Sequence, residues 1–465
     1  MGIATVAPGA IELAFSGRSG FGIYRWAYLP FHVPTGVERI RVSISHQSFS
    51  FAGVARNALD LGIFGPAGYD LGNGAGFRGW SGGARDHFEI SSAYATPGYL
   101  AGPIEPGTWV VALGPVVLNP LGMAWEAHVT LERGPSGTRL PESEAPQPLP
   151  LPSITGARWY RGDLHLHTVH SDGERHPEEL VAAARASGLD FMVSTEHNTN
   201  SANRVWPAYH TAGLLVIPGE EATTRHGHWL AVGLPPGGWV DWRYGPSDGV
   251  FPRFAAQVRD GGGLVVAAHP SVPLPGSAWE FGFDDVDALE VWNGRWNLDD
   301  EYSLRTWQRL LRQDRRVVAV GGSDSHSEHQ QVGLPQTVVH AEELSTPAIV
   351  DGLRCGRSYL ARSSGVALDL TASCGDGVAG PGQTLRVSAD GRVTVTAVLS
   401  GAAGTDVALI TAEGRVRRAM VGSDRARVCW DLDAASARFA RLEIREAQRR
   451  PLGAMVALTN PIWLA

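Results

Sequence analysis

The sequence has few cysteines, no cluster of basic residues and no long apolar run, and each absence excludes a class of protein. Its three cysteines, Cys355, Cys374 and Cys429, are widely spaced. They offer neither a disulfide framework nor a cysteine-rich zinc site, so a reducing compartment is expected. The net charge is −8 without a basic run, which disfavours binding to a nucleic-acid polymer. No stretch of about 18 apolar residues and no apolar leader occur. We therefore expect a cytoplasmic protein that does not bind a membrane.

The length and the sequence patterns predict three domains. A chain of 465 residues exceeds one hydrophobic core, since a domain commonly has about 150 residues. From 1 to 132, short alternating runs are separated by Gly, Pro, Asn and Asp, which is typical of an all-β sandwich. Residues 133–155 are proline-rich and almost free of large apolar side chains, the composition of an extended linker. From 365 to 465 the alternation predicts a second all-β sandwich.

Strand and helix patterns alternate in the central region, 156–364. A strand over 160–167 is followed by a helix over 177–186 and a strand over 189–195. Further strands are expected at 214–218, 229–234 (within a hairpin), 264–269, 286–292 and 317–321, with helices at 251–259 and 302–313. This alternation favours an α/β fold with a parallel sheet, for which a closed or nearly closed (β/α) barrel is the economical form.

Histidines are concentrated in the same region. Twelve of the sixteen lie between 165 and 340, and none follows. Four fragments end apolar runs: His165-Leu-His167, Glu196-His197, His269-Pro270 and Asp324-Ser-His326. Side chains two apart on a strand point to the same side, so such a pair can face one ion. Because the carboxyl ends of barrel strands carry the chemistry of such folds, the fragments predict a metal-dependent hydrolase.

Three further residues extend the predicted site: Asp172 in the following turn, and Glu221 and His228 from the next strand and hairpin. The candidate ligands are then His165, His167, Asp172, His197, Glu221, His228, His269, Asp324 and His326. Nine nitrogen and oxygen ligands exceed the needs of one tetrahedral ion. We expect two or three divalent ions, of Zn, Mn or Fe.

These residues resemble the PHP (polymerase and histidinol phosphatase) family, and within it the carbaryl-hydrolase-like group. The resemblance covers roughly 155–365 and rests on seven fragments in that family's order: Asp163-Leu-His-Leu-His-Thr, Ser171-Asp-Gly, Ser194-Thr-Glu-His-Asn, Pro218-Gly-Glu-Glu, Gly227-His, Ala268-His-Pro and Gly322-Ser-Asp-Ser-His. The segment Ala457–Trp463 also resembles the end of the carbaryl-hydrolase-like group. The resemblance implies a distorted (β/α)7 TIM-like barrel in which the nine ligands hold a trinuclear site.

Neighbouring residues leave alternatives at two ligand positions. Glu220 and Glu221 point in opposite directions in an extended segment, so only one can bind the ions, and the family spacing selects Glu221. His226 and His228 share a face, and the family pairing selects His228. Glu196 stands where the family usually has Asp, which predicts different hydrogen bonding around the neighbouring imidazole.

Catalytic roles are predicted for three residues outside the ligand set. A hydroxide that bridges the ions is the expected nucleophile, because a metal lowers the pKa of water to about 7. No serine elbow, phosphate loop or dinucleotide fingerprint points to another class. Arg225 is the candidate phosphate clamp, with an exposed loop charge as an even alternative. His170 and His176 are candidate acids, although surface or supporting roles are favoured for both.

Tryptophans follow two of the strands that carry this chemistry. Trp279, Trp292 and Trp296 are candidates to line the pocket and accept a ring-containing group, although core packing is the favoured role for them.

We therefore expect a divalent-metal-dependent phosphoesterase that acts on a small phosphomonoester or phosphodiester. The first alternative is a carbamate, ester or amide hydrolase that uses the same ions. The second is a non-catalytic regulatory protein that retains the metal cluster. An oligomer is compatible with the sequence, but nothing in the sequence supports one.

Overall fold

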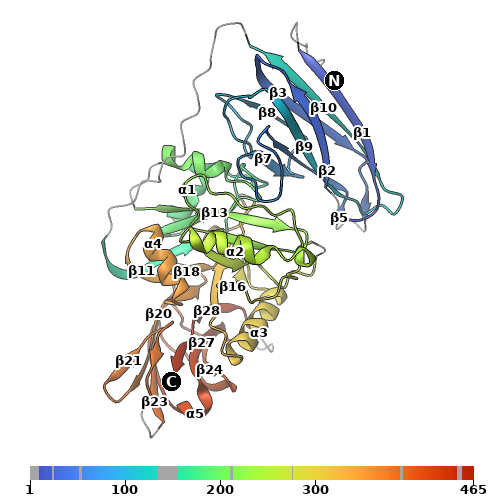
Figure 1. Cartoon of the computed structure of the whole chain (residues 1–465). Helices are drawn as coiled ribbons and strands as arrows, with labels where there is room; N and C mark the ends of the chain where they lie inside the picture. The colour runs from blue at the N-terminus through green and yellow to red at the C-terminus, as the bar shows by residue number, and fades with distance from the viewer. Residues whose placement is uncertain are drawn as a thin grey trace.

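The structure is a computed structural model that describes residues 10–23, 26–51, 55–134, 155–209, 213–274, 276–387, 391–447 and 453–465. Figure 1 shows a β-rich N-terminal region (blue) at one end, a central region (green to yellow) and a β-rich C-terminal region (orange to red) at the other end. Most of the predicted linker, 133–155, lies outside the described residues. Among the described helices, none is long and apolar enough to cross a membrane.

Two four-stranded antiparallel sheets form the N-terminal region. One has the order β1 (Ile11–Ser19), β10 (Met123–Arg133), β3 (Val37–His46) and β8 (His87–Ser91). The other has the order β2 (Ala27–Val33), β9 (Gly107–Val116), β6 (Ala58–Phe64) and β7 (Phe77–Gly82). A short hairpin joins β4 (Ser50–Phe51) to β5 (Ala55–Arg56). Both sheets bury alternate side chains in one common core, the arrangement of the predicted β-sandwich.

The central region contains a row of seven strands: β17 (Val318–Gly322), β16 (Ala288–Asn293), β15 (Leu264–Ala267), β14 (Gly227–Val232), β13 (Leu215–Thr224), β12 (Phe191–Ser194) and β11 (Thr155–Asp163). One strand of this row runs antiparallel to its neighbours, in agreement with the hairpin predicted over 229–234. Strand β14 pairs antiparallel with both of its neighbours, because the tight turn after β13 reverses the chain. The strands β11–β12–β13 and β15–β16–β17 do pair in parallel.

The two outer strands of this row approach each other at one end. An isolated parallel bridge joins Leu166, which follows β11, to Ser325, which follows β17. The carboxyl ends of the parallel strands therefore converge. A closed seven-stranded barrel stays a prediction.

The helices begin at recognisable sequence signals. Helix α1 (Pro177–Ala186) has proline in its first turn and spans the predicted range, and α2 (Phe251–Asp260) is one residue longer than predicted. Helix α3 (Leu298–Arg312) begins before the expected 302, because Asn297 and Asp300 form a capping box. The others are α4 (Thr346–Arg354), α5 (Ala434–Ala437) and 3-10 turns at Ser201–Arg204, Trp206–Tyr209 and Pro246–Asp248.

The C-terminal region shares a sheet with the central region. Strand β11 pairs with β18 (Gln336–Glu343), which pairs with β19 (Ser358–Ala361), and β19 pairs with β28 (Met455–Thr459). The sheet then continues through β27 (Phe439–Glu446), β24 (Thr405–Thr411) and β25 (Gly414–Met420). A second sheet has the order β21 (Gly377–Ala379), β20 (Ala367–Cys374), β23 (Arg392–Ser400) and β26 (Arg425–Asp433). Strand β22 (Thr384–Leu385) pairs with β29 (Ile462–Leu464).

Asn460 anchors the last strands to the centre of the molecule. Its side-chain oxygen accepts the N–H of Ala319 in β17 (2.8 Å), and its amide donates to the Ala319 carbonyl (2.9 Å) and to the Ser358 hydroxyl (2.9 Å). The predicted sandwich at 365–465 is thus continuous with the central sheet rather than separate from it.

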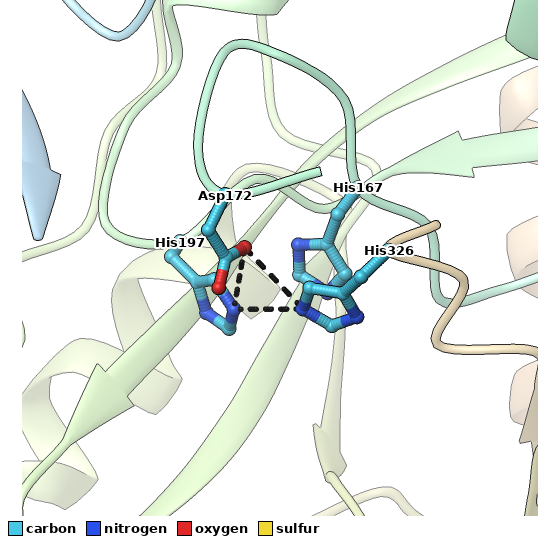
Figure 2. A group of neighbouring side chains, drawn as sticks. All are labelled: His167, Asp172, His197 and His326. Atoms are coloured by element: carbon cyan, nitrogen blue, oxygen red, sulfur yellow. Dashed lines mark hydrogen bonds and ion pairs between the residues drawn. The ribbon is translucent and has the colours of Figure 1, made fainter. Parts of the chain in front are cut away.

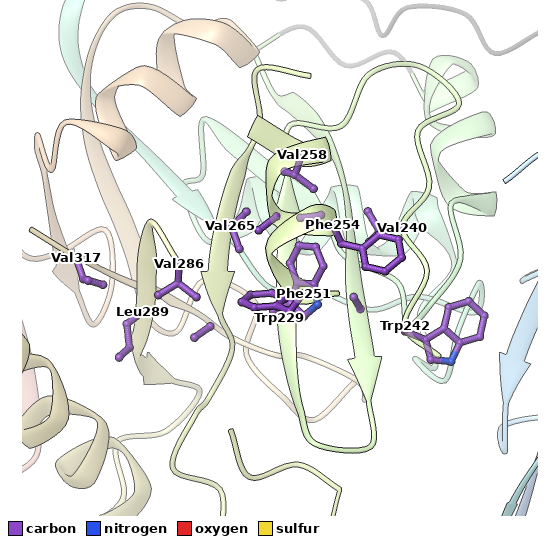
Figure 3. Packing of buried hydrophobic residues seen from close by; sticks show 14 of the residues in the cluster. Trp229, Val240, Trp242, Phe251, Phe254, Val258, Val265, Val286, Leu289 and Val317 are labelled. Atoms are coloured by element: carbon purple, nitrogen blue, oxygen red, sulfur yellow. The ribbon is translucent and has the colours of Figure 1, made fainter. Parts of the chain in front are cut away.

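A hydrophobic cluster fixes the strands that carry part of the candidate site. Helix α2 presents Phe251, Phe254 and Val258 to the sheet, the spacing of one helix face. Figure 3 shows Trp229 of β14 and Phe251 packed together in this cluster. Each such side chain contributes roughly 1.5–3 kcal/mol by burial. The packing holds β14 and β15 in register, and with them the residues that follow.

Candidate metal centre

The nine predicted ligands come from one edge of the central sheet. His165 and His167 follow β11, Asp324 and His326 follow β17, and the two segments lie side by side in parallel, with the Asp324 N–H bonded to the His165 carbonyl (2.9 Å). Leu166, between the two histidines, is fully buried in the apolar core on the other side. The alternation of an extended chain thus turns both imidazoles toward the site.

Four donor groups meet in the first part of the site. The Nε2 atom of His165 lies 3.2 Å from Glu221 Oε2 and 3.3 Å from Asp324 Oδ1. The Nε2 atom of His167 lies 3.4 Å and 3.0 Å from the same two oxygens. Both imidazoles and the Glu221 carboxylate are fully buried. We call these four residues group A.

The other oxygen of Glu221 faces two further imidazoles. Glu221 Oε1 lies 3.0 Å from His228 Nδ1 and 3.2 Å from His269 Nε2. His228 belongs to β14, directly opposite Thr223 of β13, and His269 follows β15. Glu221 with these two histidines is group B, so one carboxylate is shared by groups A and B.

The third set of donors, group C, lies nearer the surface. Asp172 Oδ1 is 3.4 Å from His197 Nε2 and 3.3 Å from His326 Nε2, and the two imidazole nitrogens are 3.4 Å apart. Figure 2 shows these side chains pointing toward one another, with His167 beside them. His197 Nδ1 also lies 2.8 Å from Glu221 Oε2, which joins group C to group A.

The spacing of these atoms fits bound metal ions. Two ligands of one ion at about 2.1 Å lie roughly 3.0–3.4 Å apart in tetrahedral or octahedral geometry. The separations above fall in or close to this range. Five buried atoms, His165 Nε2, His167 Nε2, His269 Nδ1, Glu221 Oε2 and Asp324 Oδ1, have no hydrogen-bond partner among the described residues. Unpaired buried polar atoms are costly, and four of these five face the other donors of group A, so a cation between them would satisfy them.

Charges in the site are strongly coupled. Burial disfavours charge on Glu221, but the neighbouring imidazoles of His197 and His165 hold its pKa well below the usual value. Burial together with His197 and His326 lowers the pKa of His167 to about 3. Burial disfavours charge on His197, but Glu221 and Asp172 raise its pKa to about 10, and a metal ion, which binds neutral imidazole, would have to displace that proton.

Two candidate ligands have an unusual backbone. The φ angles of His269 and Asp324 are +25° and +49°, in a region that residues with side chains rarely adopt. Such strain persists only where the surroundings enforce it, and it is frequent at functional sites.

Residues behind the donors orient them. Glu290 of β16 lies 3.2 Å from His165 Nδ1, and the Asp324 carbonyl accepts from His326 Nδ1 (2.8 Å). Each contact places the proton on Nδ1 and leaves Nε2 free to face the site. Asn293 donates to Glu290 (3.1 Å) and to Asp324 (3.3 Å).

Glu290 was not among the predicted site residues. A carboxylate between the apolar residues Leu289 and Val291 of the strand Ala288–Asn293 was the available signal, because a fully buried charge needs a partner.

The Glu196 carboxylate is hydrogen-bonded to the loop that follows His167. Its carboxylate accepts the Thr168 N–H (3.1 Å), the Thr168 hydroxyl (2.6 Å) and the Ser171 hydroxyl (2.6 Å). The longer acid therefore holds the loop that carries Asp172. His197 Nδ1 instead lies 2.6 Å from the Thr223 hydroxyl.

The structure distinguishes Glu220 from Glu221 and His226 from His228 by the direction in which each side chain points. Glu220 points away from the site and accepts the Val240 N–H (3.0 Å), while Glu221 faces the imidazoles. His226 pairs with Glu280 (2.8 Å), outside the three groups, whereas His228 faces Glu221.

The three predicted catalytic residues are dispersed. His170 is buried and bonded to the Ser201 hydroxyl (2.9 Å), and burial lowers its pKa to about 4. His176 is exposed and precedes helix α1. The structure brings neither to the donor groups. Arg225 lies close to them, but it is tied to the N-terminal region through the Ile23 carbonyl and through Asp60 at 3.6 Å.

A cavity of about 640 Å³ opens over the donor groups. Asp172, His197 and His228 line one side of it. The N-terminal sandwich supplies the other side, including Trp26 and Asp60. Arg225 stands between the two sides, with its guanidinium 4.1 Å from the centre of the Trp26 ring.

The tryptophans that line this cavity are not the three that the sequence offered as candidates, for which core packing was the favoured role. Trp26, Trp80 and Trp242 are among its lining residues, whereas Trp279, Trp292 and Trp296 are not. Trp292 is buried in the core, and Trp296 donates to Glu301 (2.8 Å). Tryptophans that follow a strand in sequence need not face its carboxyl end, and two of the lining tryptophans come from the N-terminal region.

Fold and site together define a candidate metal-binding protein with a cavity of small-molecule size over its donor groups. No protein-family model matches the chain. No curated protein matches it either.

Similarities to solved structures are limited. A two-domain protein from Bacteroides vulgatus that contains a predicted PHP-like metal-dependent phosphoesterase is 16% identical, with 69% of this chain and 99% of that chain covered and a TM-score of 0.39. A protein from Bifidobacterium adolescentis proposed to be a metal-dependent phosphoesterase is 21% identical, with 42% and 95% covered and a TM-score of 0.29. An amidohydrolase from Chromobacterium violaceum is 18% identical, with 37% and 89% covered and a TM-score of 0.28. These TM-scores are too low to transfer a fold or an activity to this chain.

Proposed function

We propose that this protein is a divalent-metal-dependent phosphoesterase of the PHP type that acts on a small phosphomonoester or phosphodiester. One observation carries the proposal: groups A, B and C converge on one site, and both oxygens of the buried Glu221 take part in it. A structural metal site usually closes with four ligands. Three linked groups, of which B and C reach an open cavity through His228, His197 and Asp172, suit a hydrolytic centre better.

The residues of the chain prepare the site before any substrate arrives. Divalent ions bound there would lower the pKa of a water molecule to about 7 and neutralise negative charge that develops on the substrate. Glu290 and the Asp324 carbonyl fix the imidazoles of His165 and His326 in the tautomer that exposes Nε2. Glu196 holds the loop that carries Asp172 at the cavity edge. Little reorganisation is then needed when the ligands engage.

The cavity limits the size of the substrate. A volume of about 640 Å³ lies within the range of small-molecule sites. The Nη2 atom of Arg225 is buried and has no hydrogen bond to a described residue. It lies 3.6 Å from Asp60 Oδ2, and it is a donor that can reach a phosphoryl oxygen bound in the cavity.

Asp60 favours a second candidate, hydrolysis of a carbamate, ester or amide. Its carboxylate lies 3.6 Å from Arg225 and offsets part of the positive charge that a phosphate group would meet. A neutral carbonyl substrate avoids that conflict. The aromatic wall at Trp26 suits a ring-containing leaving group of either class.

One assay series separates these functions. Metal-free protein would be reconstituted with Mn, Zn or Fe(II) and offered 4-nitrophenyl phosphate, bis(4-nitrophenyl) phosphate and an aryl carbamate. Turnover of a phosphoester that disappears in Glu221→Gln supports the proposal. Turnover of the carbamate alone replaces it with the second candidate. Bound metal without turnover of any substrate favours a regulatory protein.

A further inference from the structure

A second cavity, of about 430 Å³, lies between helix α3 and the C-terminal sheet. Helix α3 contributes five polar side chains, at 301, 305, 308, 309 and 312, and strands β25 and β27 contribute three more arginines. None of the candidate metal ligands lines it. The charged residues of this arginine pocket are Glu301, Arg305, Arg309, Arg312, Arg415, Arg441, Glu443 and Arg445.

The two carboxylates of the arginine pocket are already paired with its two buried arginines. Arg441 lies 2.9 Å from Glu443, and Arg445 contacts both Glu301 and Glu443. Six arginines against two glutamates leave a surplus of four positive charges. Among the described residues, Arg305, Arg309, Arg312 and Arg415 have no carboxylate within 4.0 Å, although Arg415 interacts electrostatically with Glu443 and Arg312 donates through Nε to the Ala412 carbonyl.

Arg441 forms a rigid base for the pocket. Its side chain is only 1% exposed, it donates through Nε and Nη2 to Gln308 Oε1 (3.0 and 2.7 Å), and it lies 4.8 Å from the centre of the Trp307 ring. Its Nη1 atom is buried and has no hydrogen-bond partner among the described residues. A buried guanidinium held from two sides loses little freedom when an anion binds beside it.

The kind of ligand follows from the donors. The chain contains arginine but no lysine, so every cation here is a planar fork that binds phosphate or carboxylate through two parallel hydrogen bonds. We propose that the arginine pocket binds a compact small molecule with at least two phosphate-like anionic groups. One such group would meet Arg309 and Arg415 at the rim, and the other would approach Arg441. The proposal does not depend on hydrolase activity.

Calorimetric titration of the metal-free protein with pyrophosphate tests this inference, with phosphate, sulfate and sodium chloride at matched ionic strength as comparisons. We expect pyrophosphate to bind more tightly than the single anions. The double variant Arg309→Gln/Arg415→Gln should weaken binding at least about tenfold, because two charge-assisted contacts are removed. The matched control is Arg417→Gln, an exposed arginine of the same strand β25 that does not line the pocket, and its affinity should stay within about twofold.

Three results would overturn the proposal. The first is an absence of pyrophosphate binding to the wild-type protein. The second is an unchanged affinity in the double variant, which would place the anion elsewhere, for instance at the metal centre. The third is equal weakening by Arg417→Gln, which would indicate general charge attraction. Circular dichroism checks folding, and if the double variant is unfolded, Arg305→Gln alone must weaken binding several-fold.

Discussion

Replacing Glu221 by glutamine tests the organisation of the metal centre most directly. The two carboxylate oxygens of Glu221 together lie within 3.4 Å of the imidazole nitrogens of five histidines, in all three groups. The amide removes a negative charge and replaces one acceptor oxygen by a donor that faces imidazoles. Loss of a residue that only supports a ligand typically costs 10–100-fold in metal affinity or activity. For this shared ligand we expect at least about 100-fold, equivalent to roughly 2.7 kcal/mol.

The adjacent residue supplies the matched control. Glu220 is equally buried, but it faces the other way and accepts one hydrogen bond, from the Val240 N–H, which an amide oxygen can also accept. Bound metal per chain is measured by mass spectrometry after reconstitution, and kcat/KM with the best substrate found. Glu221→Gln should lose metal from groups A and B, and Glu220→Gln should retain the wild-type content. Full metal content and rate in Glu221→Gln, or loss of metal in Glu220→Gln, would refute the assignment.

Three further predictions concern the surroundings of the site. Burial raises the pKa of Asp60 to about 6 from 3.8, so between these pH values the folded state binds more protons than the unfolded state. The free energy of unfolding of the wild type relative to Asp60→Asn should therefore fall by about 2–3 kcal/mol from pH 4 to 6 and then level off. Denaturant titrations at several pH values measure this change. Glu196→Ala leaves three hydrogen-bond donors unpaired, so it should lower the free energy of unfolding by about 3 kcal/mol and reduce the metal held by the Asp172 loop, as measured by denaturation and metal analysis. In Gly114→Ala the new methyl carbon would meet Asp60 Oδ2 at 2.6 Å and Arg225 Nη2 at 2.8 Å. The displaced side chains should lower kcat/KM about tenfold or more with unchanged metal content. An unchanged rate would show that this wall of the cavity does not contact the substrate.

The parts of the molecule that depend on local spacing could be predicted from the sequence. Helix α1 follows from a proline at 177 and an apolar face, and it spans the predicted residues. The pairs at 165 and 167 and at 324 and 326 converge because alternation in an extended chain is a local property. The same property indicated that only one of Glu220 and Glu221 could face the ions, and the family resemblance selected Glu221.

Contacts between distant segments were beyond prediction. The cavity wall from the N-terminal sandwich depends on how Asp60 approaches Arg225, which no short motif encodes. That Trp26, Trp80 and Trp242 line the cavity was not predictable for the same reason, whereas the burial of Trp292 agrees with the core packing favoured for it. Strand β14, in contrast, agrees with the hairpin predicted over 229–234, because its tight turn is a local feature.

The pairing of β19 with β28 has a consequence for synthesis of the chain. Strand β19 ends at Ala361, and its partner begins only at Met455. While the ribosome makes the residues between them, the central sheet has an open edge and Asn460 has not yet joined β17 to the Ser358 strand. Exposed edges of this kind pair readily with other chains. The nascent protein is therefore most vulnerable to aggregation after its metal-binding residues have emerged and before residues 455–464 have done so.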